Sequence, residues 1–485
     1  MRTFALIILR NKNNKSQFNT TKFNVKLTKA SVLMMTCVSM FYMNASFAIT
    51  PTQQAVANYF ANSVCTPGII AAESSPIVAR SLSNNSVRTN NINAQGYNTA
   101  NYDCSSLSGT ALFQNGIENM LNNGSTVSTN NFLSAIAFEE VITMGTLNVE
   151  INGAQMNHIV AHVAGLHQGG LGMRYPSLPA QKLAQSGTPT GGAASGSVSN
   201  KNGMGFFVNT RIDTGEKDET SIESGFDFNA YGITGGMDIR LNNQFVLGLA
   251  AGYGKTKADY TNSVGTMDMD GYSLSVFGTF YKKDRYYIDG IVNLTRNNFD
   301  SSRTFTDPNG TVQTANANTD GDILNVGLGF GYEYHNKDIT IGPFAKLNYT
   351  RVDIDGFTET GAGPWGLIVN GQRLSSFEGV VGMQVSKTIS KPWGVLIPQV
   401  RLELVHEFDN ESRIINAQYI GAVQNGINTL LLQPTDVPDE NYFNLSISAA
   451  TQLSHGRSAY AQYTALLGQK NLSEHALELG VRWDY

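Results

Sequence analysis

The stretch His475-Ala-Leu-Glu-Leu-Gly-Val-Arg-Trp-Asp-Tyr485 decides the fold of this chain. Side chains alternate between the two faces of a β-strand, and one face here carries the large apolar residues Leu477, Leu479, Val481, Trp483 and Tyr485. The other face carries Glu478, Gly480, Arg482 and Asp484. A soluble edge strand would leave its apolar face uncovered, whereas a strand between lipid and a polar lumen needs this pattern. The stretch therefore predicts a transmembrane β-strand.

The composition of the 485-residue chain agrees with a fold made of many strands. Charged residues make up only 15%, and there are 48 glycines and 20 tyrosines; about 25% charged residues is typical of soluble proteins. Few charges with many glycines and aromatics fit strands, tight turns and aromatic girdles. The net charge of -5 shows no basic bias, so we expect no nucleic-acid partner.

The N-terminus has the features of a secretory signal. Three lysines precede an apolar segment at 30–43, and Ser46-Phe47-Ala48 supplies small residues where a signal peptidase cleaves. We therefore expect residues 1–48 to be a signal peptide, with cleavage after Ala48. Beyond it, no apolar run reaches the 18 or more residues that a transmembrane helix needs.

Two cysteines, Cys65 and Cys104, follow the predicted cleavage site. An oxidising compartment outside the inner membrane would permit a disulfide between them. The alternative is two free thiols. We favour the bridge because two cysteines within one small exported segment usually pair.

The region between the signal and residue 203 divides by composition. Residues 49–130 are rich in Asn, Ser and Thr, whereas apolar residues at helical spacing predict helices over 131–144 and 147–168. A Gly/Ser/Ala/Thr tract follows at 186–199 and is typical of a flexible linker. We therefore expect an N-terminal domain at 49–185, a linker at 186–202 and a third domain at 203–485.

From residue 203 onward the hydrophobic period becomes two, which predicts strands. We expect twelve of them, near 204–213, 225–241, 244–259, 265–283, 286–303, 320–335, 339–356, 370–388, 395–409, 440–453, 457–468 and 471–485. The even number and alternating turn lengths predict a 12-stranded antiparallel transmembrane β-barrel. Short turns would face the periplasm, and the longer connections 304–319 and 410–439 would face the outside.

Inward-facing charges of the predicted strands are candidates for the lumen lining. These are Arg401, Glu403, Glu478 and Arg482. They could contact a chain that passes through the pore, or they could simply solvate the lumen in compensating pairs. For any single residue we favour the second interpretation.

The histidines of the second predicted helix are a candidate metal site. His158 and His162 are four residues apart, and His167 is nearby, which resembles the spacing of zinc ligands. The stretch lacks the glutamate of the metalloprotease motif, so surface histidines are the favoured interpretation and we expect no metal and no cofactor. Residues 49–200 contain no Gly-x-Ser-x-Gly motif, so we expect no enzyme.

Several motifs of residues 203–485 resemble the autotransporter β-domain family. They are Gly235-Gly-Met-Asp-Ile-Arg240 followed by 247–253, Gly342-Pro-Phe-Ala-Lys-Leu-Asn-Tyr349, and the stretch from Pro398 to Phe408. The aromatic end resembles the assembly signal of bacterial outer-membrane barrels, carried here by Leu477, Leu479, Val481, Trp483 and Tyr485. Residues 131–172 are more loosely similar to the helical segment that precedes the barrel in this family.

The resemblance implies type V secretion in the bacterial outer membrane. Its expected partners are outer-membrane lipid, the barrel-assembly machinery, periplasmic chaperones and an unknown surface ligand. The expected function is export or display of the short N-terminal domain at the cell surface, with adhesion as one role. Two alternatives stay open: a barrel plugged by its N-terminal segment, with a structural or narrow-pore role, and an autotransporter with an unrecognised hydrolase passenger.

Overall fold

The computed structural model describes most of residues 203–485 and a few residues before them. Within 203–485 it leaves out 221, 243, 261–263, 283–285, 308, 454–455 and 485. The earlier residues that it describes are 56, 59, 66–67, 92–93, 96–97, 102–103, 144–145, 159–160, 162–163 and 166. The predicted signal with its cleavage site at Ala48, the predicted linker, and Cys65 and Cys104 lie outside the described residues.

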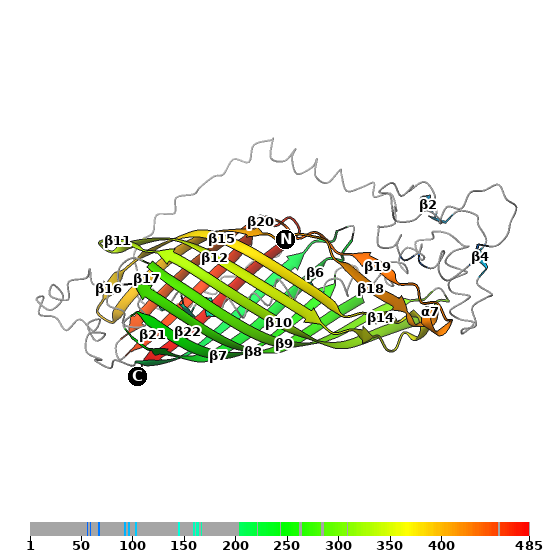
Figure 1. Ribbon diagram of the computed structural model, residues 1–485, viewed down its shortest axis with the longest axis horizontal. Coiled ribbons are helices and arrows are strands. Elements are labelled where there is room, and N and C mark those ends of the chain that lie inside the picture. Colours follow the sequence, from blue (N-terminus) through cyan, green and yellow to red (C-terminus); the bar gives the residue numbers. More distant parts are fainter. Residues whose placement is uncertain are drawn as a thin grey trace, which may run out of the picture. The chain divides into compact units, whose positions relative to one another are not determined.

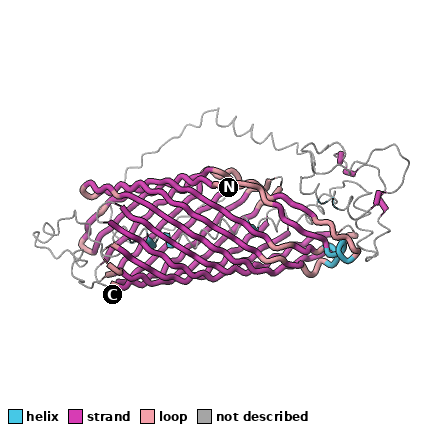
Figure 2. Tube along the Cα trace, in the orientation of Figure 1, coloured by secondary structure: helices cyan, strands magenta, loops and turns pink. Residues whose placement is uncertain are grey.

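Twelve antiparallel strands close into a barrel, as predicted (Figures 1 and 2). Each pairs with its chain neighbours, and β22 pairs with β5 to complete the ring. The strands are β5 (Met204–Lys217), β6 (Phe226–Arg240), β7 (Phe245–Tyr260), β8 (Val264–Lys282), β9 (Tyr286–Thr306), β10 (Val312–Tyr332), β12 (Ile339–Ile354), β15 (Gln372–Lys387), β17 (Gly394–Glu407), β20 (Asn441–Leu453), β21 (Arg457–Leu467) and β22 (Leu472–Asp484).

The two ends of the barrel differ in their connections. At one end, which we call the turn end, the strands join through short hairpins, two of which carry the three-residue strands β11 (Tyr334–Asn336) and β16 (Ile389–Lys391). The start of β5 and the end of β22 also lie there. The opposite end, the loop end, carries the long connections 355–371 and 408–440. The turn end is the predicted periplasmic side.

Along the strands, the apolar face switches from the outside of the barrel to the inside. Near the turn end, Leu247, Leu328 and Leu479 point outward and are exposed, as lipid-facing residues must be. Near the loop end, Phe228, Phe299 and Phe305 point inward and are buried. Outward positions there are polar, for example Lys257, Asp259, Arg296, Asp320 and Asp322. A wall with a dry inside and a charged outside fits a part of the barrel that stands in water.

This switch explains why the predicted long loop at 304–319 is wrong. β9 continues to Thr306 and β10 starts at Val312, so the connection is a tight turn. Residues of these strand ends, such as Asn316 and Asn318, lack the outward apolar side chains on which the strand prediction relied. Their inward neighbours Ala315 and Ala317 are buried instead.

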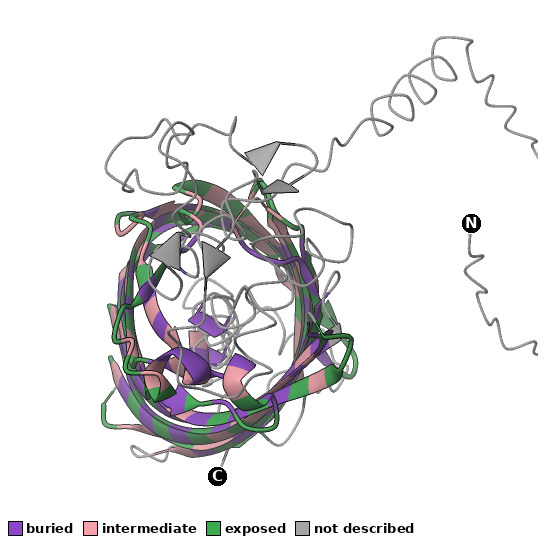
Figure 3. Ribbon diagram, turned by 90° about the vertical axis from the view of Figure 1, so that its right-hand side faces the viewer, coloured by how far each residue is buried: buried purple, intermediate pink, exposed green. Residues whose placement is uncertain are grey.

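A second, smaller sheet lies at the loop end. Its order is β13 (Phe357–Thr358), β14 (Leu367–Val369), β18 (Ile414–Tyr419) and β19 (Leu431–Pro434). The 3-10 helix η5 (Gly363–Trp365) and the short helix α7 (Ile420–Gln424) complete it. We call this module the loop sheet. Figure 3 looks into the loop end, where a short helical stretch lies in the lower part of the barrel opening. The expected loop 410–439 thus contains β18, α7 and β19.

The described N-terminal residues include parts of the predicted helices and two small strand pairs. Residues 144–145, 159–160 and 162–163 are helical; the remainder of both predicted helices lies outside the described residues. β1 (Thr66–Pro67) pairs with β4 (Tyr102–Asp103), and β2 (Ile92–Asn93) pairs with β3 (Gly96–Tyr97). In the part of the chain that the structure describes, no helix combines the length and apolarity required to cross a membrane.

Candidate functional site: the barrel lumen and its docked segment

Helical residues of the N-terminal segment pack inside the barrel near the turn end. Ile159, Val163 and Leu166 are buried. They form one apolar cluster with residues of the first barrel strands, namely Phe207, Val246, Ala250, Phe277 and Ile291. Burial of these side chains favours docking by the hydrophobic effect, about 25 cal/mol for each Å² of apolar surface removed from water. The lumen therefore has an apolar wall against which these helical residues pack.

Other N-terminal residues pack against the apolar interior of the loop end. Val56, Tyr59 and Met144 are buried there. Their partners, which together we call the loop-end cup, include Phe226, Phe228, Tyr260, Phe299, Phe305, Trp365, Leu367 and Tyr419. The rings of Tyr59 and Tyr419 lie 5.8 Å apart between centroids. Burial raises the pKa of Tyr59 to about 12.

His162 faces the barrel wall. Its Nε2 lies 3.1 Å from Oδ2 of Asp238, and its ring stacks on Phe207 with centroids 3.6 Å apart. The side chain is only 3% exposed, so the predicted surface position of His162 is wrong. The periodicity of the helix gave no indication of a partner 76 residues away. His158 and His167 lie outside the described residues.

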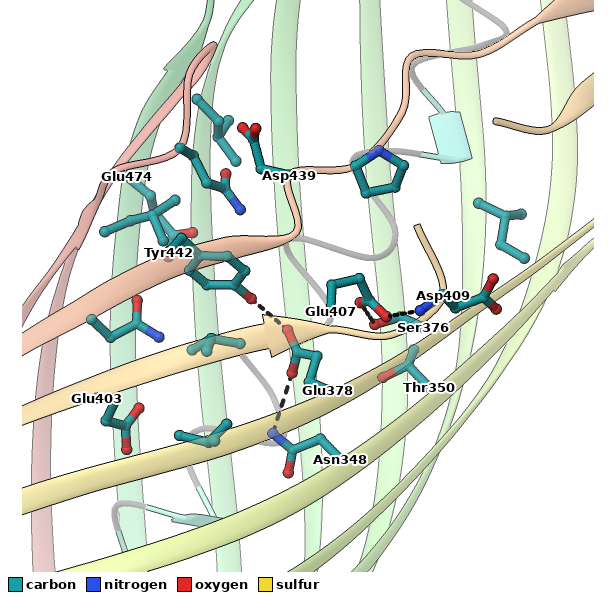
Figure 4. A pocket seen from close by; sticks show the side chains of 18 of the residues that line it. Asn348, Thr350, Ser376, Glu378, Glu403, Glu407, Asp409, Asp439, Tyr442 and Glu474 are labelled. Carbon is teal, nitrogen blue, oxygen red and sulfur yellow. Dashed lines mark hydrogen bonds between the residues drawn. The ribbon is translucent and has the colours of Figure 1, made fainter. Parts of the chain in front are cut away.

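The opposite side of the lumen contains a polar cavity of about 420 Å³. Its lining comes largely from β12, β15, β17, β20, β21 and β22, with Val160 of the docked helix on one side. Glu378 accepts hydrogen bonds from the Tyr442 hydroxyl at 2.5 Å and the Asn348 amide at 3.2 Å (Figure 4). Glu407 accepts from the Ser376 hydroxyl at 2.5 Å. The lumen is thus largely apolar where Ile159, Val163 and Leu166 pack, and polar on the other side.

The predicted lumen residues lie as follows. Arg401 and Glu403 line the polar cavity; Glu403 accepts from Arg401 Nε at 2.8 Å and from Lys346 Nζ at 2.7 Å. Glu478 is buried and accepts from the Tyr460 hydroxyl at 2.5 Å. Arg482 is buried and donates to Asp238. Arg401, Glu403 and Arg482 thus have oppositely charged partners, and Glu478 has a hydroxyl donor.

The proposed assembly residues lie on the outer face of β22. Leu477, Leu479, Val481 and Trp483 are 38–46% exposed, whereas Tyr485 lies outside the described residues. Sequence reasoning missed the partners Lys346 and Asp238, although both occupy the inward phase of their strands. That phase could have identified them as lumen residues but could not have paired them.

Comparisons with known proteins agree with the barrel. Residues 206–464 match the profile of the "Autotransporter beta-domain". The chain is 24% identical over 367 residues to "Outer membrane protein B" of Rickettsia prowazekii, covering 74% of this chain and 21% of that protein. It is 27% identical over 208 residues to "Outer membrane protein A" of Rickettsia conorii, covering 41% of this chain and 10% of that protein. The chain thus spans about a fifth or less of the length of these relatives.

A solved structure is similar at a lower level of identity. The "Translocator domain of autotransporter NalP from Neisseria meningitidis" is 16% identical, with a TM-score of 0.47 over 58% of this chain and 88% of that one.

Proposed function

Because this chain belongs to the autotransporter β-domain family and resides in the outer membrane, we propose that its barrel exports its own N-terminal segment and holds that segment at the outer face. The observation that carries the proposal is the order of contacts along the lumen. Val56 and Tyr59 pack in the loop-end cup, whereas Ile159 to Leu166 pack near the turn end, where β5 begins. The earlier of these described residues thus lie at the predicted outer end of the barrel, and the later ones lie toward the predicted periplasmic end.

The apolar inner face at the loop end supports an N-terminal segment that stays docked and is not released. Inward aromatic residues such as Phe226 and Phe299 stand at the loop end, where the outward face is polar. A hollow apolar cup open to water would be unfavourable. Val56, Tyr59 and Met144 cover part of it together with the loop sheet. In this proposal, the exported segment buries apolar side chains in the loop-end cup, and this burial favours transfer. The step therefore needs no nucleotide hydrolysis.

Protease shaving of intact cells tests the export step. The full-length protein would carry an epitope tag after Ala48, and the barrel would be followed separately by its heat-modifiable migration. Loss of the tag with an intact barrel supports export. Protection in intact cells, with digestion only after the outer membrane is permeabilised, supports the second candidate, a barrel plugged by its own N-terminal segment.

The plugged barrel has an observation of its own. Of the N-terminal residues whose burial the structure describes, Val160 is half-buried, and the buried ones include Val56, Tyr59, Met144, Ile159, His162, Val163 and Leu166. A segment so enclosed would close the pore and strengthen the barrel. Ion conductance of the purified protein in planar bilayers, before and after proteolysis of the segment, measures that role.

We propose adhesion to a surface ligand as the role of any displayed residues. Cells that express the full-length protein would be compared with cells that express the same barrel without residues 66–103, in binding to host-cell and extracellular-matrix surfaces. Equal binding would rule out this role.

The matched β-domain is not an enzyme domain and does not include the N-terminal segment, so labelling with activity-based hydrolase probes tests the remaining alternative.

A further inference from the structure

Three parts of the chain that are far apart in the sequence meet at one buried carboxylate. Asp238 of β6 accepts hydrogen bonds from Arg482 of β22, with Nη2 to Oδ1 at 2.7 Å and Nε to Oδ2 at 3.1 Å. The same Oδ2 lies 3.1 Å from Nε2 of His162 in the docked helix. The Asp238 side chain is fully buried, and those of Arg482 and His162 are 6% and 3% exposed. Arg482 also forms an ion pair with Asp484 of its own strand, so Asp238 is the group that joins β6, β22 and the docked helix.

The strand register shows that this contact spans the seam of the barrel. The seam is the pairing of β22 with β5, the last and first strands. Arg482 faces Phe207 across the seam, and Asp238 faces Gly205 on the other side of β5. Arg482 must therefore reach over β5 to meet Asp238. Gly205 makes this possible, because a Cβ atom there would overlap the guanidinium group of Arg482.

The surface that receives His162 is consequently a composite of both ends of the barrel sequence. Phe207 of β5 stacks on the imidazole, Phe277 of β8 meets it edge-on at 5.5 Å between centroids, and Asp238 bonds it. Arg482 holds the Asp238 carboxylate in place and neutralises it. Before β22 pairs with β5, Asp238 lacks this cation, and burying its charge beneath the helix is costly.

We propose that Asp238 couples closure of the barrel seam to packing of the docked helix. Closure completes the site for His162, and by thermodynamic reciprocity the docked His162 stabilises the closed seam. His162, Asp238 and Arg482 are positioning residues in this mechanism. The inference rests on the barrel and its docked helix and does not require export, so protease shaving and the following experiment can fail independently.

The experiment follows seam closure in the full-length protein. Cysteines at Thr214 and His475, which face each other on the outer side of the seam and are not among the proposed assembly residues, would form a disulfide only when β5 and β22 are paired. A pulse-chase in cells, with the cross-linked peptide quantified by mass spectrometry, gives the rate of closure. His162→Phe keeps an aromatic ring on Phe207 but removes the bond to Asp238. We expect a several-fold lower yield of cross-link at early times for this variant.

A control distinguishes coupling through Asp238 from a general weakening of the pairing between β5 and β22. Arg211 of β5 pairs with Glu474 of β22 at 3.1 Å, so Glu474→Gln weakens the seam away from the helix. The His162→Phe effect should disappear in an Asp238→Asn background and persist in a Glu474→Gln background. Wild-type closure in His162→Phe overturns the proposal. So does an equal effect of His162→Phe in all three backgrounds. If the Asp238→Asn variant does not assemble, the Gly205→Ala variant serves as the background in its place, because a Cβ atom at position 205 displaces Arg482.

Discussion

Arg303 of the barrel wall and Glu359 of the long loop form a buried, two-pronged ion pair. Nε lies 2.9 Å from Oε1 and Nη2 lies 2.7 Å from Oε2, and both side chains are at most 5% exposed. Glu359 also accepts from the backbone N–H of Leu367 at the start of β14. The Glu359 carboxylate thus connects the loop sheet to β9 at the loop-end cup.

Replacing Glu359 with Gln should loosen the loop sheet while the barrel remains. The change leaves the Arg303 charge buried without its counter-ion, which costs about 3–5 kcal/mol when one partner of a buried pair is removed. Limited proteolysis of the folded protein in detergent should then cleave within 355–371. The matched control is Asp322→Asn, which removes an exposed partner of Arg296 and should change nothing measurable. Equal protease resistance in both variants would contradict the role of this pair.

Position 402 and position 399 of β17 should respond oppositely to the same new charge. Leu402 is 49% exposed on the outer face and Gln399 is 6% exposed on the inner face. Leu402→Arg places a cation in lipid at a cost of about 2–4 kcal/mol near the midplane, whereas Gln399→Arg places it in the polar lumen. Urea unfolding in lipid bilayers measures the difference. If both variants were equally stable, the assignment of inner and outer faces would be wrong.

The aromatic end of β22 should matter for assembly more than for the stability of the finished barrel. We expect Trp483→Ala combined with Tyr485→Ala to reduce the amount of folded, heat-modifiable protein in the outer membrane. The matched control is Tyr231→Ala, because Tyr231 is an exposed aromatic residue on the outer face of β6, away from the C-terminal strand. Normal levels of folded protein in the double variant would remove the proposed assembly role.

The cysteine pair can be tested through its described neighbours. Thr66 pairs with Asp103 and Pro67 with Tyr102, and these residues adjoin Cys65 and Cys104 in the sequence. We expect a disulfide between the two cysteines, because two cysteines within one small exported segment usually pair. Non-reducing peptide mapping should find the bridged peptide. Cys65→Ser should speed digestion of 66–103, and two alkylated thiols in the native protein would refute the bridge.

The lipid-facing half of the barrel could be predicted from sequence because solvent fixes its pattern. Lipid requires apolar residues such as Leu328 and Leu479 at every second position, and this period located all twelve strands to within a few residues, apart from the early start of β10. The alternation of apolar residues no longer identifies lipid-facing positions where the strands pass from lipid into water. Above the lipid, Phe299 and Phe305 turn inward, so the same alternation carries the opposite meaning and the strand ends at 304–319 resemble a loop.

The contacts inside the lumen could not be predicted, because they join distant segments without a local signal. The spacing of His158 and His162 suggested a metal site or a wet helix face, whereas His162 bonds Asp238 across 76 positions. Asp238 and Arg482 each had the correct inward phase. Their meeting depends on Gly205 lying between them in the register of β22, β5 and β6, which only the closed barrel defines.

The loop-end cup should release the N-terminal segment when a charge enters it. Tyr59 is 5% exposed and lies against Tyr419, so Tyr59→Glu would bury a carboxylate among aromatic rings, which is strongly unfavourable without a partner. We expect faster protease removal of a tag after Ala48, with unchanged heat-modifiability of the barrel because no lipid-facing residue is altered. Val437→Glu is the control, since Val437 is 62% exposed at the same end. Identical tag loss in both variants would mean that Tyr59 does not hold the segment, and docking would then depend on the helix at Ile159 to Leu166.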